Sequence, residues 1–516
     1  MIPAASLVRT SPAPRASARE RVLLITPPSL FLLDERVFMS LGILKVAASL
    51  ERAGNPVELL DLSGIDNFEE VAGIQAAQTS SKTVAITVTT PQLPAAVKIV
   101  ARIRAVRPDI RVIAGGPHVT LVHSAVKLEL RQGRVGRAHI ALAKLESIFD
   151  VLVSGDGEHS IFEAIAPGAP KVIDADLPGK GLFMSSADYE DTPYPARHLV
   201  DASSYKYSIE GFPATSLIAQ LGCPFACGFC GGRNSNMLRR IRTRSTASIV
   251  GEIEHLHRTY GYTGFMMYDD ELNVSKSLVE LMDSITDLQS RLGVEFRLRG
   301  FIKSELFNDA QAVAMRRAGF RWILCGFESA NPRILENINK KATLEDNDKV
   351  MEICRKHDLK VKALTSVGHP GESEESISDL RDWLIKSAPD DFDCTTITTY
   401  PGTPYYDEAV PHSDVKDAWT YTCKKSGDRL HSYDVDYCEV ADYYKGDPSG
   451  GYHSYVFTDH LSGDEIVFLR NRLEQDVRKK LHIPFNPGAP GLKYEHSFGQ
   501  GQLPLHILRS NEGKSK

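Results

Sequence analysis

The chain has 516 residues, enough for about three domains at roughly 150 residues each. Its net charge of −6, without a long basic run, argues against a nucleic-acid groove, and no apolar stretch reaches the roughly 20 residues that cross a bilayer. Residues 1–20 lack the apolar core of a secretory signal, and the eight cysteines, all at or after residue 223, do not resemble a disulfide framework. We therefore expect a cytoplasmic protein with a flexible extension over residues 1–20 and with neither a membrane nor a nucleic-acid partner.

Residues 21–175 alternate short apolar runs with helical patterns. Helical spacing of apolar residues predicts helices over 42–53 and 93–106. The apolar runs predict buried strands over 22–25, 57–60, 84–88, 112–114 and 151–153. Repeated strand–helix units predict a doubly wound, Rossmann-like parallel sheet whose ligand lies over the carboxyl ends of the strands.

The loops after the third, fourth and fifth of these strands contain small and polar residues. These residues are Thr89, Thr90, Gly116, Pro117, His118, Gly155 and Gly157. None of the loops matches a dinucleotide or triphosphate motif. On their own, such glycines are more often ordinary turns, and His118 suits a local hydrogen bond at a helix terminus as well as it suits a ligand.

Prolines interrupt residues 176–215, which we interpret as a linker. Six further strand–helix units follow over residues 216–400. The predicted strands are 216–221, 264–270, 294–299, 321–327, 360–367 and 392–399, with helices near 245–260, 276–291, 304–318, 344–358 and 373–387. This order predicts a partial (β/α)6 barrel, a fold that places its chemistry at the carboxyl ends of the strands.

The first barrel strand leads into a loop with Cys223, Cys227 and Cys230. Thiolates are soft ligands, and three of them on a glycine-rich loop indicate an iron–sulfur cluster or zinc. A zinc site needs a fourth ligand, which no nearby Cys or His pair offers. A set of inert thiols is the other alternative.

Polar residues close the next three predicted strands. Asp269 and Asp270 end the second strand, Arg299 the third and Glu328 the fourth. Each acidic residue alone is more often an exposed loop carboxylate. Their shared placement at the strand ends indicates a binding site.

We expect residues 401–483 to form a small, mainly helical or irregular cap, and a lid over the substrate is one hypothesis for its role. A helix is predicted from Ser462 to about Leu481, where Ser462 and Glu465 form a capping box. Residues 484–516 are rich in proline and glycine and predict a flexible tail.

The cysteine loop resembles the CxxxCxxC motif of the radical S-adenosylmethionine (radical SAM) superfamily, including the aromatic Phe229 before the last cysteine. The resemblance implies a 4Fe-4S cluster held by three cysteines, with one iron free to bind S-adenosyl-L-methionine. It implies cleavage of SAM to a 5′-deoxyadenosyl radical with an electron from an external donor of flavodoxin or ferredoxin type. The SAM contacts it implies are Phe229, Asp269, Asp270, Arg299 and Glu328.

The loops of the first domain, in their order, resemble the cobalamin-binding domain that precedes the barrel in one radical SAM subclass. The Asp-x-His-x-x-Gly sequence of the classical cobalamin site is absent, so the resemblance implies cobalamin bound without a histidine from the protein. The cobalamin contacts it implies are Thr89, Thr90, Gly116, Pro117, His118, Gly155 and Gly157.

Together the two resemblances predict a cobalamin-dependent methyltransferase that uses methylcobalamin to methylate an unactivated carbon of a small molecule. The main alternative is rearrangement, cyclisation or oxidation without methyl transfer. A non-catalytic cobalamin or metal sensor is a third interpretation, which does not explain polar residues on several strand ends. The sequence identifies neither a catalytic residue nor the substrate.

Overall fold

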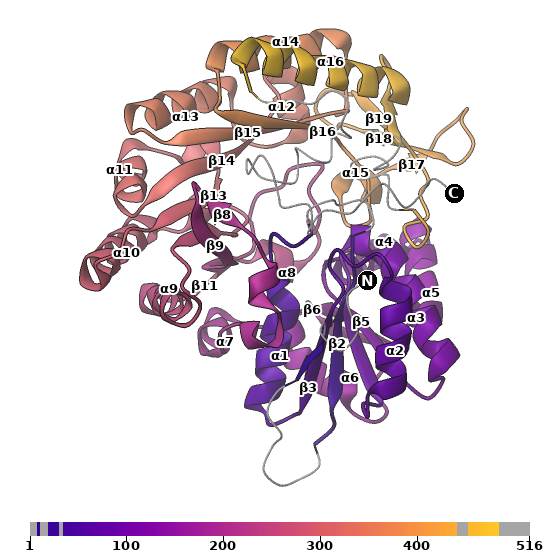
Figure 1. Ribbon diagram of the computed structural model, residues 1–516. Helices are drawn as coiled ribbons and strands as arrows, with labels where there is room; N and C mark the ends of the chain where they lie inside the picture. The colour runs from indigo at the N-terminus through magenta and orange to yellow at the C-terminus, as the bar shows by residue number, and fades with distance from the viewer. Residues whose placement is uncertain (1–7, 11–18, 30–34, 441–452, 484–516) are drawn as a thin grey trace.

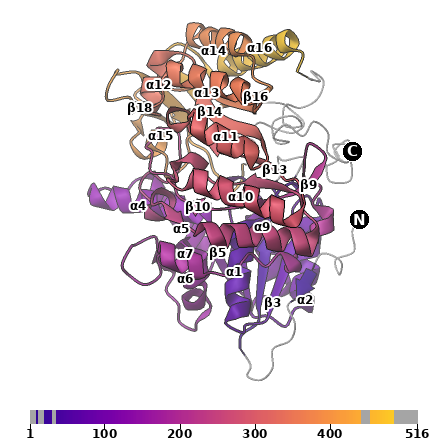
Figure 2. The same cartoon turned by 90° about the vertical axis from the view of Figure 1, so that its left-hand side faces the viewer.

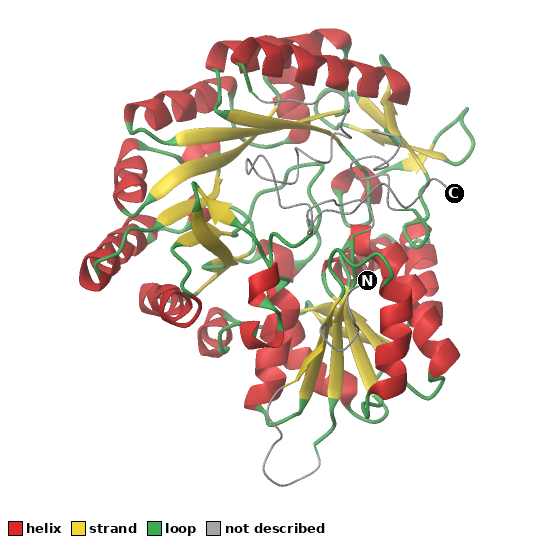
Figure 3. Ribbon diagram, viewed as in Figure 1, coloured by secondary structure: helices red, strands yellow, loops and turns green. Residues whose placement is uncertain are grey.

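The computed structural model describes residues 8–10, 19–29, 35–440 and 453–483. Two seven-stranded sheets and one four-stranded sheet form its framework (Figures 1 and 3). The predicted flexible tail lies outside the described residues, as does most of the predicted N-terminal extension.

The first sheet has the strand order β1-β3-β2-β4-β5-β6-β7, and only β1 runs antiparallel to its neighbour. Its strands are β1 (Val8–Thr10), β2 (Val22–Thr26), β3 (Val57–Asp61), β4 (Thr83–Thr87), β5 (Arg111–Gly115), β6 (Val151–Gly155) and β7 (Val172–Ala175). The five predicted strands are confirmed, and the parallel sheet is the one expected. The edge strands β1 and β7 were not predicted.

Helices cover both faces of this sheet. They are α1 (Leu41–Arg52), α2 (Phe68–Gln78), α3 (Leu93–Val106), α4 (Pro117–Arg131), α5 (Arg137–Ile148) and α6 (Gly157–Ile165). Helices α2 to α5 pack into the apolar core on one face, and α1 and α6 pack into the core on the other. Burial on both faces explains why the strands are nearly continuous apolar runs.

The second sheet has the order β16-β15-β14-β13-β12-β9-β8 and is parallel except for β8. Its strands are β8 (Ser208–Ile209), β9 (Phe212–Leu217), β12 (Gly264–Met267), β13 (Arg297–Ile302), β14 (Phe320–Glu328), β15 (Lys360–Val367) and β16 (Asp391–Thr396). Its helices are α9 (Thr246–Tyr260), α10 (Leu278–Leu292), α11 (Asp309–Arg317), α12 (Pro332–Ile338), α13 (Leu344–Lys356) and α14 (Glu374–Ser387). The sheet curls into the predicted partial barrel, with α9, α10, α11, α13 and α14 on its convex side (Figure 1).

Two strand boundaries of the barrel differ from the prediction. Strand β9 ends at Leu217, and the two-residue strands β10 (Gln220–Leu221) and β11 (Arg242–Thr243) form a separate antiparallel ladder around the cysteine loop. Strand β13 begins and ends three residues later than predicted. The short helices α7 (Ser186–Asp191) and α8 (Asn236–Arg239) flank this region.

The C-terminal part contains the predicted helix as α16 (Gly463–Leu481), with the Ser462–Glu465 capping box in place. It also contains an antiparallel sheet that the sequence did not predict. The sheet is formed by β17 (Val410–Pro411), β18 (Ala418–Thr422), β19 (Arg429–Tyr433) and β20 (Val456–Thr458), preceded by α15 (Pro404–Asp407). Among the described residues, no helix combines the length and apolarity that a bilayer crossing requires.

The barrel lies over one end of the first sheet, as two perpendicular views show (Figures 1 and 2). Buried polar contacts join the two parts. Arg242 donates to Asp156 at 2.6 Å, and Asp176 accepts from the Ser235 hydroxyl at 2.8 Å and the Met237 amide at 2.6 Å. Asp156 and Asp176 directly follow β6 and β7, so the carboxyl ends of the first sheet face the cysteine-loop region of the barrel.

Candidate functional site

The loop from β9 to β11 carries the three cysteines, and its backbone is held by its surroundings. The Cys223 amide donates to Leu238 O at 3.0 Å, and the Gly228 amide donates to Ile338 O at 2.7 Å. Asn339 donates its side-chain amide to Ala226 O at 2.9 Å. The loop is therefore braced from two sides, by α8 and by the end of α12.

Two glycines in this loop are required by close contacts. Gly222 has φ +87°, and a Cβ there would collide with the carbonyl of Arg240. A Cβ on Gly228 would come within 2.5 Å of the Tyr405 ring. The loop can approach its neighbours this closely only because both positions lack a side chain.

Cys223, Cys227 and Cys230 are free thiols on this loop, with Cys227 buried and the other two half-buried. Burial raises the pKa of Cys223 to about 11 and that of Cys230 to about 12. A bound metal reverses this trend, because a coordinating thiol is deprotonated outright. Arg233 Nη2 lies 3.9 Å from Cys230 Sγ and supplies a donor for a thiolate.

The donor set, the close backbone and the nearby guanidinium fit a thiolate-bound cluster. Within the described ranges, no three His, Cys, Asp or Glu side chains already converge as a finished metal centre. The assignment of the three cysteines as cluster ligands therefore stays a prediction.

Asp269 and Asp270 follow β12, as predicted, and differ in their surroundings. Asp269 is buried, and its Oδ1 accepts from the amides of Ala219 at 3.1 Å and Gln220 at 2.5 Å. Its Oδ2 has no hydrogen-bond partner among the described residues, and burial raises its pKa to about 7. Asp270 is exposed. One oxygen of Asp269 thus shapes the cysteine loop and the other is available to a ligand.

Glu328 ends β14 at a register shift of the sheet and has φ +60°. Its carboxylate accepts from Lys340 Nζ at 3.1 Å and from the Ser366 hydroxyl at 2.8 Å. His369 Nε2 lies 2.8 Å from the same hydroxyl, and its ring contacts Phe229 edge-on at 5.6 Å between centroids. The structure thus brings Glu328 and Phe229 to one buried polar cluster.

Sequence reasoning missed two buried lysines of this cluster. Lys303 follows β13, donates to Lys340 O at 2.7 Å, and places its ammonium 4.2 Å from the centroid of the Phe225 ring. Lys340 pairs with Glu328, and both lysines oppose the desolvation that raises the pKa of Glu271 to about 7. Loop lysines are mostly exposed, so the sequence contains no signal that separates these two from others.

The predicted position of Arg299 at the end of a strand is wrong. Because β13 continues to Ile302, Arg299 lies inside the strand and pairs in register with Trp322, six residues before Glu328. At roughly 3.3 Å per residue this places it about 20 Å from Glu328 along the sheet. The Arg299 guanidinium is buried and lies 5.6 Å from the centroid of the Trp322 ring.

The seven predicted cobalamin contacts lie at the carboxyl ends of β4, β5 and β6 and in the turns and first helical residues that follow these strands. Gly116 has φ +101° and Gly155 has φ +108°, so neither position suits a side chain. A Cβ on Gly155 would meet Ala175 and Asp176 at 2.5 Å, and one on Gly157 would meet Val46 at 2.8 Å. The last two glycines are thus already explained by contacts within the chain, and their contact with a corrin stays a prediction.

His118 is buried at the start of α4, directly after Pro117, which occupies the first turn of the helix. Its Nδ1 lies 3.0 Å from the Thr90 hydroxyl, and Thr89 forms a capping box with Gln92. Burial lowers the pKa of His118 to about 4, so the ring is neutral at pH 7. Of the two roles open from the sequence, these contacts support the local hydrogen bond.

The two groups of loops approach each other through α4. A Cβ on Gly231, just after Cys230, would lie 3.0 Å from the Leu121 side chain, and one on Gly402 would lie 3.1 Å from the Leu121 carbonyl. Leu121 is in the second turn of α4, close to Gly116 and His118. The fold and site thus define a two-part α/β protein in which a cysteine loop faces the carboxyl ends of the strands of a second parallel sheet.

Comparison with known proteins agrees with this description. The sequence model of the radical SAM superfamily matches residues 217–384, and that of the B12 binding domain matches residues 35–146. The chain belongs to the radical SAM enzymes that carry a B12-binding domain. The cofactors of these two domains are the predicted ones: a 4Fe-4S cluster, SAM and cobalamin.

Two curated relatives and one solved structure illustrate the similarity. An uncharacterized methyltransferase, PH0819 of Pyrococcus horikoshii, is 24% identical over 76% of this chain and 84% of its own length. The anaerobic magnesium-protoporphyrin IX monomethyl ester cyclase of Cereibacter sphaeroides is 24% identical over 66% of this chain but only 55% of its own length. The methyltransferase TsrM of Kitasatospora setae, solved with cobalamin and a [4Fe-4S] cluster, superposes with a TM-score of 0.62 at 18% identity, covering 91% of this chain and 92% of TsrM. At that identity the likeness shows the fold alone.

Proposed function

We propose that the chain is a cobalamin-dependent radical SAM methyltransferase that methylates an unactivated carbon of a small molecule. The observation that carries this proposal is the approach of the cysteine loop to the loop edge of the first sheet, through Leu121, Gly231 and Gly402. Methyl transfer requires that a substrate atom reach both cofactors, and this arrangement brings their predicted sites together. The substrate stays unassigned, and we propose a cytoplasmic location.

The two cofactors define the chemistry when bound: the cluster with SAM supplies a hydrogen-abstracting 5′-deoxyadenosyl radical, and the cobalamin supplies a methyl group. The residues of the chain would bind and orient these cofactors and shield them from solvent. Cys223, Cys227 and Cys230 would hold the cluster as thiolates. The Lys340–Glu328 pair fixes a carboxylate at the barrel mouth, and the second oxygen of Asp269 offers an acceptor for the SAM amine. Leu121 of α4 lies against Gly231 and Gly402 at the junction, where exclusion of water would protect a radical.

The test is an anaerobic reconstitution with iron, sulfide and cobalamin, followed by analysis of the products from SAM. We expect bound iron and cobalamin, and formation of both 5′-deoxyadenosine and S-adenosylhomocysteine. Cys227→Ala should lose cluster absorbance and 5′-deoxyadenosine, whereas Cys438→Ser, a half-buried cysteine outside the loop, should retain both. Protein with zinc in place of iron would contradict the radical assignment.

The similarity to the cyclase favours one alternative, a cobalamin-binding radical SAM enzyme that cyclises, rearranges or oxidises its substrate. It predicts 5′-deoxyadenosine without S-adenosylhomocysteine in the same assay. The external electron donor of flavodoxin or ferredoxin type remains part of the proposal for either activity.

A further inference from the structure

Arg233 lies three residues after Cys230, just beyond a tight turn of the cysteine loop. The turn depends on Gly232, which has φ +80° and whose Cβ would come within 2.4 Å of an α8 side chain. The Gly232 amide donates to Gly402 O at 2.9 Å, and the Arg233 carbonyl accepts from Arg239 Nη1 at 3.3 Å. These contacts fix the backbone from which the Arg233 side chain extends.

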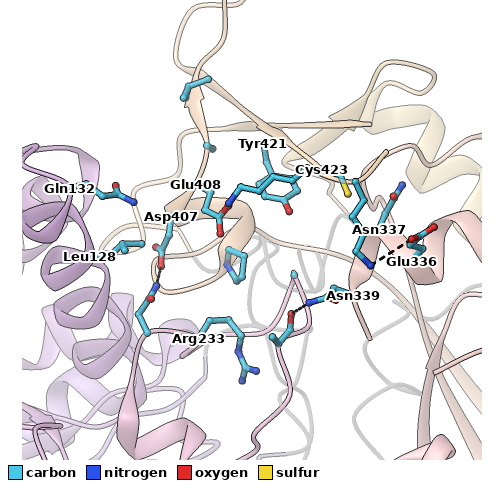
Figure 4. A pocket seen from close by; sticks show the side chains of 18 of the residues that line it. Leu128, Gln132, Arg233, Glu336, Asn337, Asn339, Asp407, Glu408, Tyr421 and Cys423 are labelled. Atoms are coloured by element: carbon cyan, nitrogen blue, oxygen red, sulfur yellow. Dashed lines mark hydrogen bonds and ion pairs between the residues drawn. The ribbon is translucent and has the colours of Figure 1, made fainter. Parts of the chain in front are cut away.

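The guanidinium of Arg233 is directed at the cysteines. Its Nη2 lies 3.9 Å from Cys230 Sγ. Burial raises the pKa values of the Cys223 thiol and the Asp270 carboxyl, and the positive charge of Arg233 opposes both shifts. In the view of the cavity between the loop and the cap, the Arg233 side chain extends away from the Glu408 carboxylate (Figure 4). The charge of Arg233 therefore acts on the cysteine side of the loop.

Two donors of this guanidinium have no acceptor. Nε and Nη1 of Arg233 are buried and lack a hydrogen-bond partner among the described residues. Arginine stays charged in proteins, so burying its N–H groups without partners costs free energy. Such groups in a native protein require an explanation, and a bound ion or a redox role is one. The two spare donors thus indicate an anionic acceptor next to Cys230.

Two other arginines of the same segment differ from Arg233. Arg239 donates to the carbonyl oxygens of Arg233 and Pro224, the latter at 2.8 Å, so its guanidinium braces the backbone. Arg240 is exposed, and its guanidinium carbon lies 5.9 Å from the centroid of the Phe183 ring. Of these three arginines, Arg233 combines a sulfur contact with buried spare donors.

Sulfur atoms of a cluster match the acceptor that Arg233 requires. A cluster held by the loop would place anionic sulfur close to Cys230, both as thiolate and as inorganic sulfide. Hydrogen bonds to these sulfurs are among the factors that set the reduction potential of a cluster. A nearby cation favours the reduced state, because the negative charge of the cluster increases when it gains an electron. The planar fork of arginine can donate to neighbouring acceptors at once.

We propose that Arg233 donates hydrogen bonds to the sulfur atoms of the cluster and raises its reduction potential. The inference rests on the proposed function, because it requires an iron–sulfur cluster at the three cysteines. In the step that Arg233 tunes, the cluster gains one electron from an external donor, and no bond forms or breaks. Arg233 is then a cluster-contacting residue that the cysteine motif itself does not contain.

The test is a potentiometric titration of the reconstituted protein without SAM, with dithionite as the reductant and the reduced cluster followed by EPR. At a fixed potential, Arg233→Met should lower the ratio of reduced to oxidised cluster by roughly tenfold, which corresponds to about 59 mV for a one-electron couple. Arg240→Met is the matched control, because it removes the same charge from an exposed position of the same segment. The control variant should titrate like the wild type.

Equal potentials for the wild type and Arg233→Met would overturn the proposal. Equal shifts in Arg233→Met and Arg240→Met would overturn it as well, because they would reflect general electrostatics of the segment. An unchanged potential together with a weaker Kd for SAM would assign the guanidinium to the SAM carboxylate in place of the cluster, which also contradicts the proposal.

A variant that fails to retain iron does not end the test. Arg233→Gln keeps an amide donor and loses only the charge, so it replaces Arg233→Met in the same titration, where a shift in the same direction is expected. Wild-type protein without a redox-active cluster would contradict the proposed function and this inference together. An unchanged potential in a cluster-containing variant would contradict the inference alone.

Discussion

At the scale of single residues, the buried ion pair of Lys340 and Glu328 combines burial with an unusual backbone conformation. Both side chains are almost fully buried, and Glu328 adopts a left-handed backbone conformation that non-glycine residues rarely take. Strained residues of this kind persist where the surroundings hold them, and they cluster at functional sites. The pair therefore positions a carboxylate at a cost in stability, which makes its energetics testable.

Lys340→Met should destabilise the protein by about 3–5 kcal/mol, because it leaves the Glu328 carboxylate buried without its cation. Adding Glu328→Gln should recover most of this loss, since the stranded charge is then removed. The measurement is chemical denaturation of the wild type, the single variant and the double variant. A double variant no more stable than the single one would show that the lysine acts through packing alone.

His118 provides a pH-dependent prediction at the same scale. Burial lowers the pKa of His118 from 6.5 to about 4 in the folded protein. Between these two pH values, the unfolded chain therefore binds a proton at His118 and the folded protein does not. Stability contributed by the neutral ring is therefore present above pH 6.5 and is lost toward pH 4, by about 3 kcal/mol in total.

His118→Asn should keep a polar partner for Thr90 and flatten this pH dependence, as measured by the free energy of unfolding between pH 7 and pH 4.5. His460→Asn, at an exposed histidine, is the matched control and should follow the wild-type curve. Parallel curves for wild type and His118→Asn would show that the ring is protonated in the folded state.

At the scale of elements, hydrophobic periodicity predicted the buried strands and most barrel helices to within a few residues. Helix 93–106 and strand 360–367 coincide with α3 and β15. The failures have physical reasons. The edge strands β1 and β7 and the cap strands are short, and their residues are set by pairing with distant segments rather than by local pattern. The three-residue error at β13 moved Arg299 from the strand interior to its end.

The cysteine loop depends on Gly222, whose positive φ and close contact with the Arg240 carbonyl both exclude a side chain. Gly222→Ala should therefore displace the loop and lose most of the bound iron, measured by iron content and cluster absorbance after reconstitution.

Gly261→Ala is the control for Gly222→Ala, because it introduces backbone strain without a steric clash. Gly261 ends α9 with φ +74°, and a Cβ there would meet nothing within 4 Å. Gly261→Ala should lower the free energy of unfolding by only about 1–2 kcal/mol, the strain of a left-handed alanine. The variant should keep its iron. Equal iron loss in both variants would indicate general destabilisation instead of a specific demand at the loop.

At the scale of the whole molecule, the sequence predicted the carboxyl ends of both parallel sheets but not how the two ends lie relative to each other. Placing Asp269 and Glu328 at strand ends followed from the strand–helix rhythm, because parallel strands share one carboxyl edge. The pairing of Lys340 with Glu328, and the contact of Leu121 with Gly231, depend on segments far apart in the chain. Residue type and spacing do not encode such contacts, so they emerged only from the structure.

The bridge from Arg242 to Asp156 couples the two halves. Arg242 also donates to Met184 O at 3.1 Å and Met237 O at 2.9 Å, and Asp156 lies between the predicted cobalamin contacts Gly155 and Gly157. Arg242→Met should cost about 3–5 kcal/mol, as expected for a broken buried pair. It should also shift the first sheet relative to the barrel.

Because the cysteine loop and Glu328 belong to the barrel, this variant should reduce S-adenosylhomocysteine formation more than 5′-deoxyadenosine formation. The ratio of the two products, measured well below the unfolding temperature, is the readout. Arg258→Met breaks an exposed pair with Glu254 on α9 and should leave the ratio unchanged. If both products fall in parallel in Arg242→Met, the bridge stabilises the fold without aligning the two sites, and the approach of the sheets would lose its role in methyl transfer.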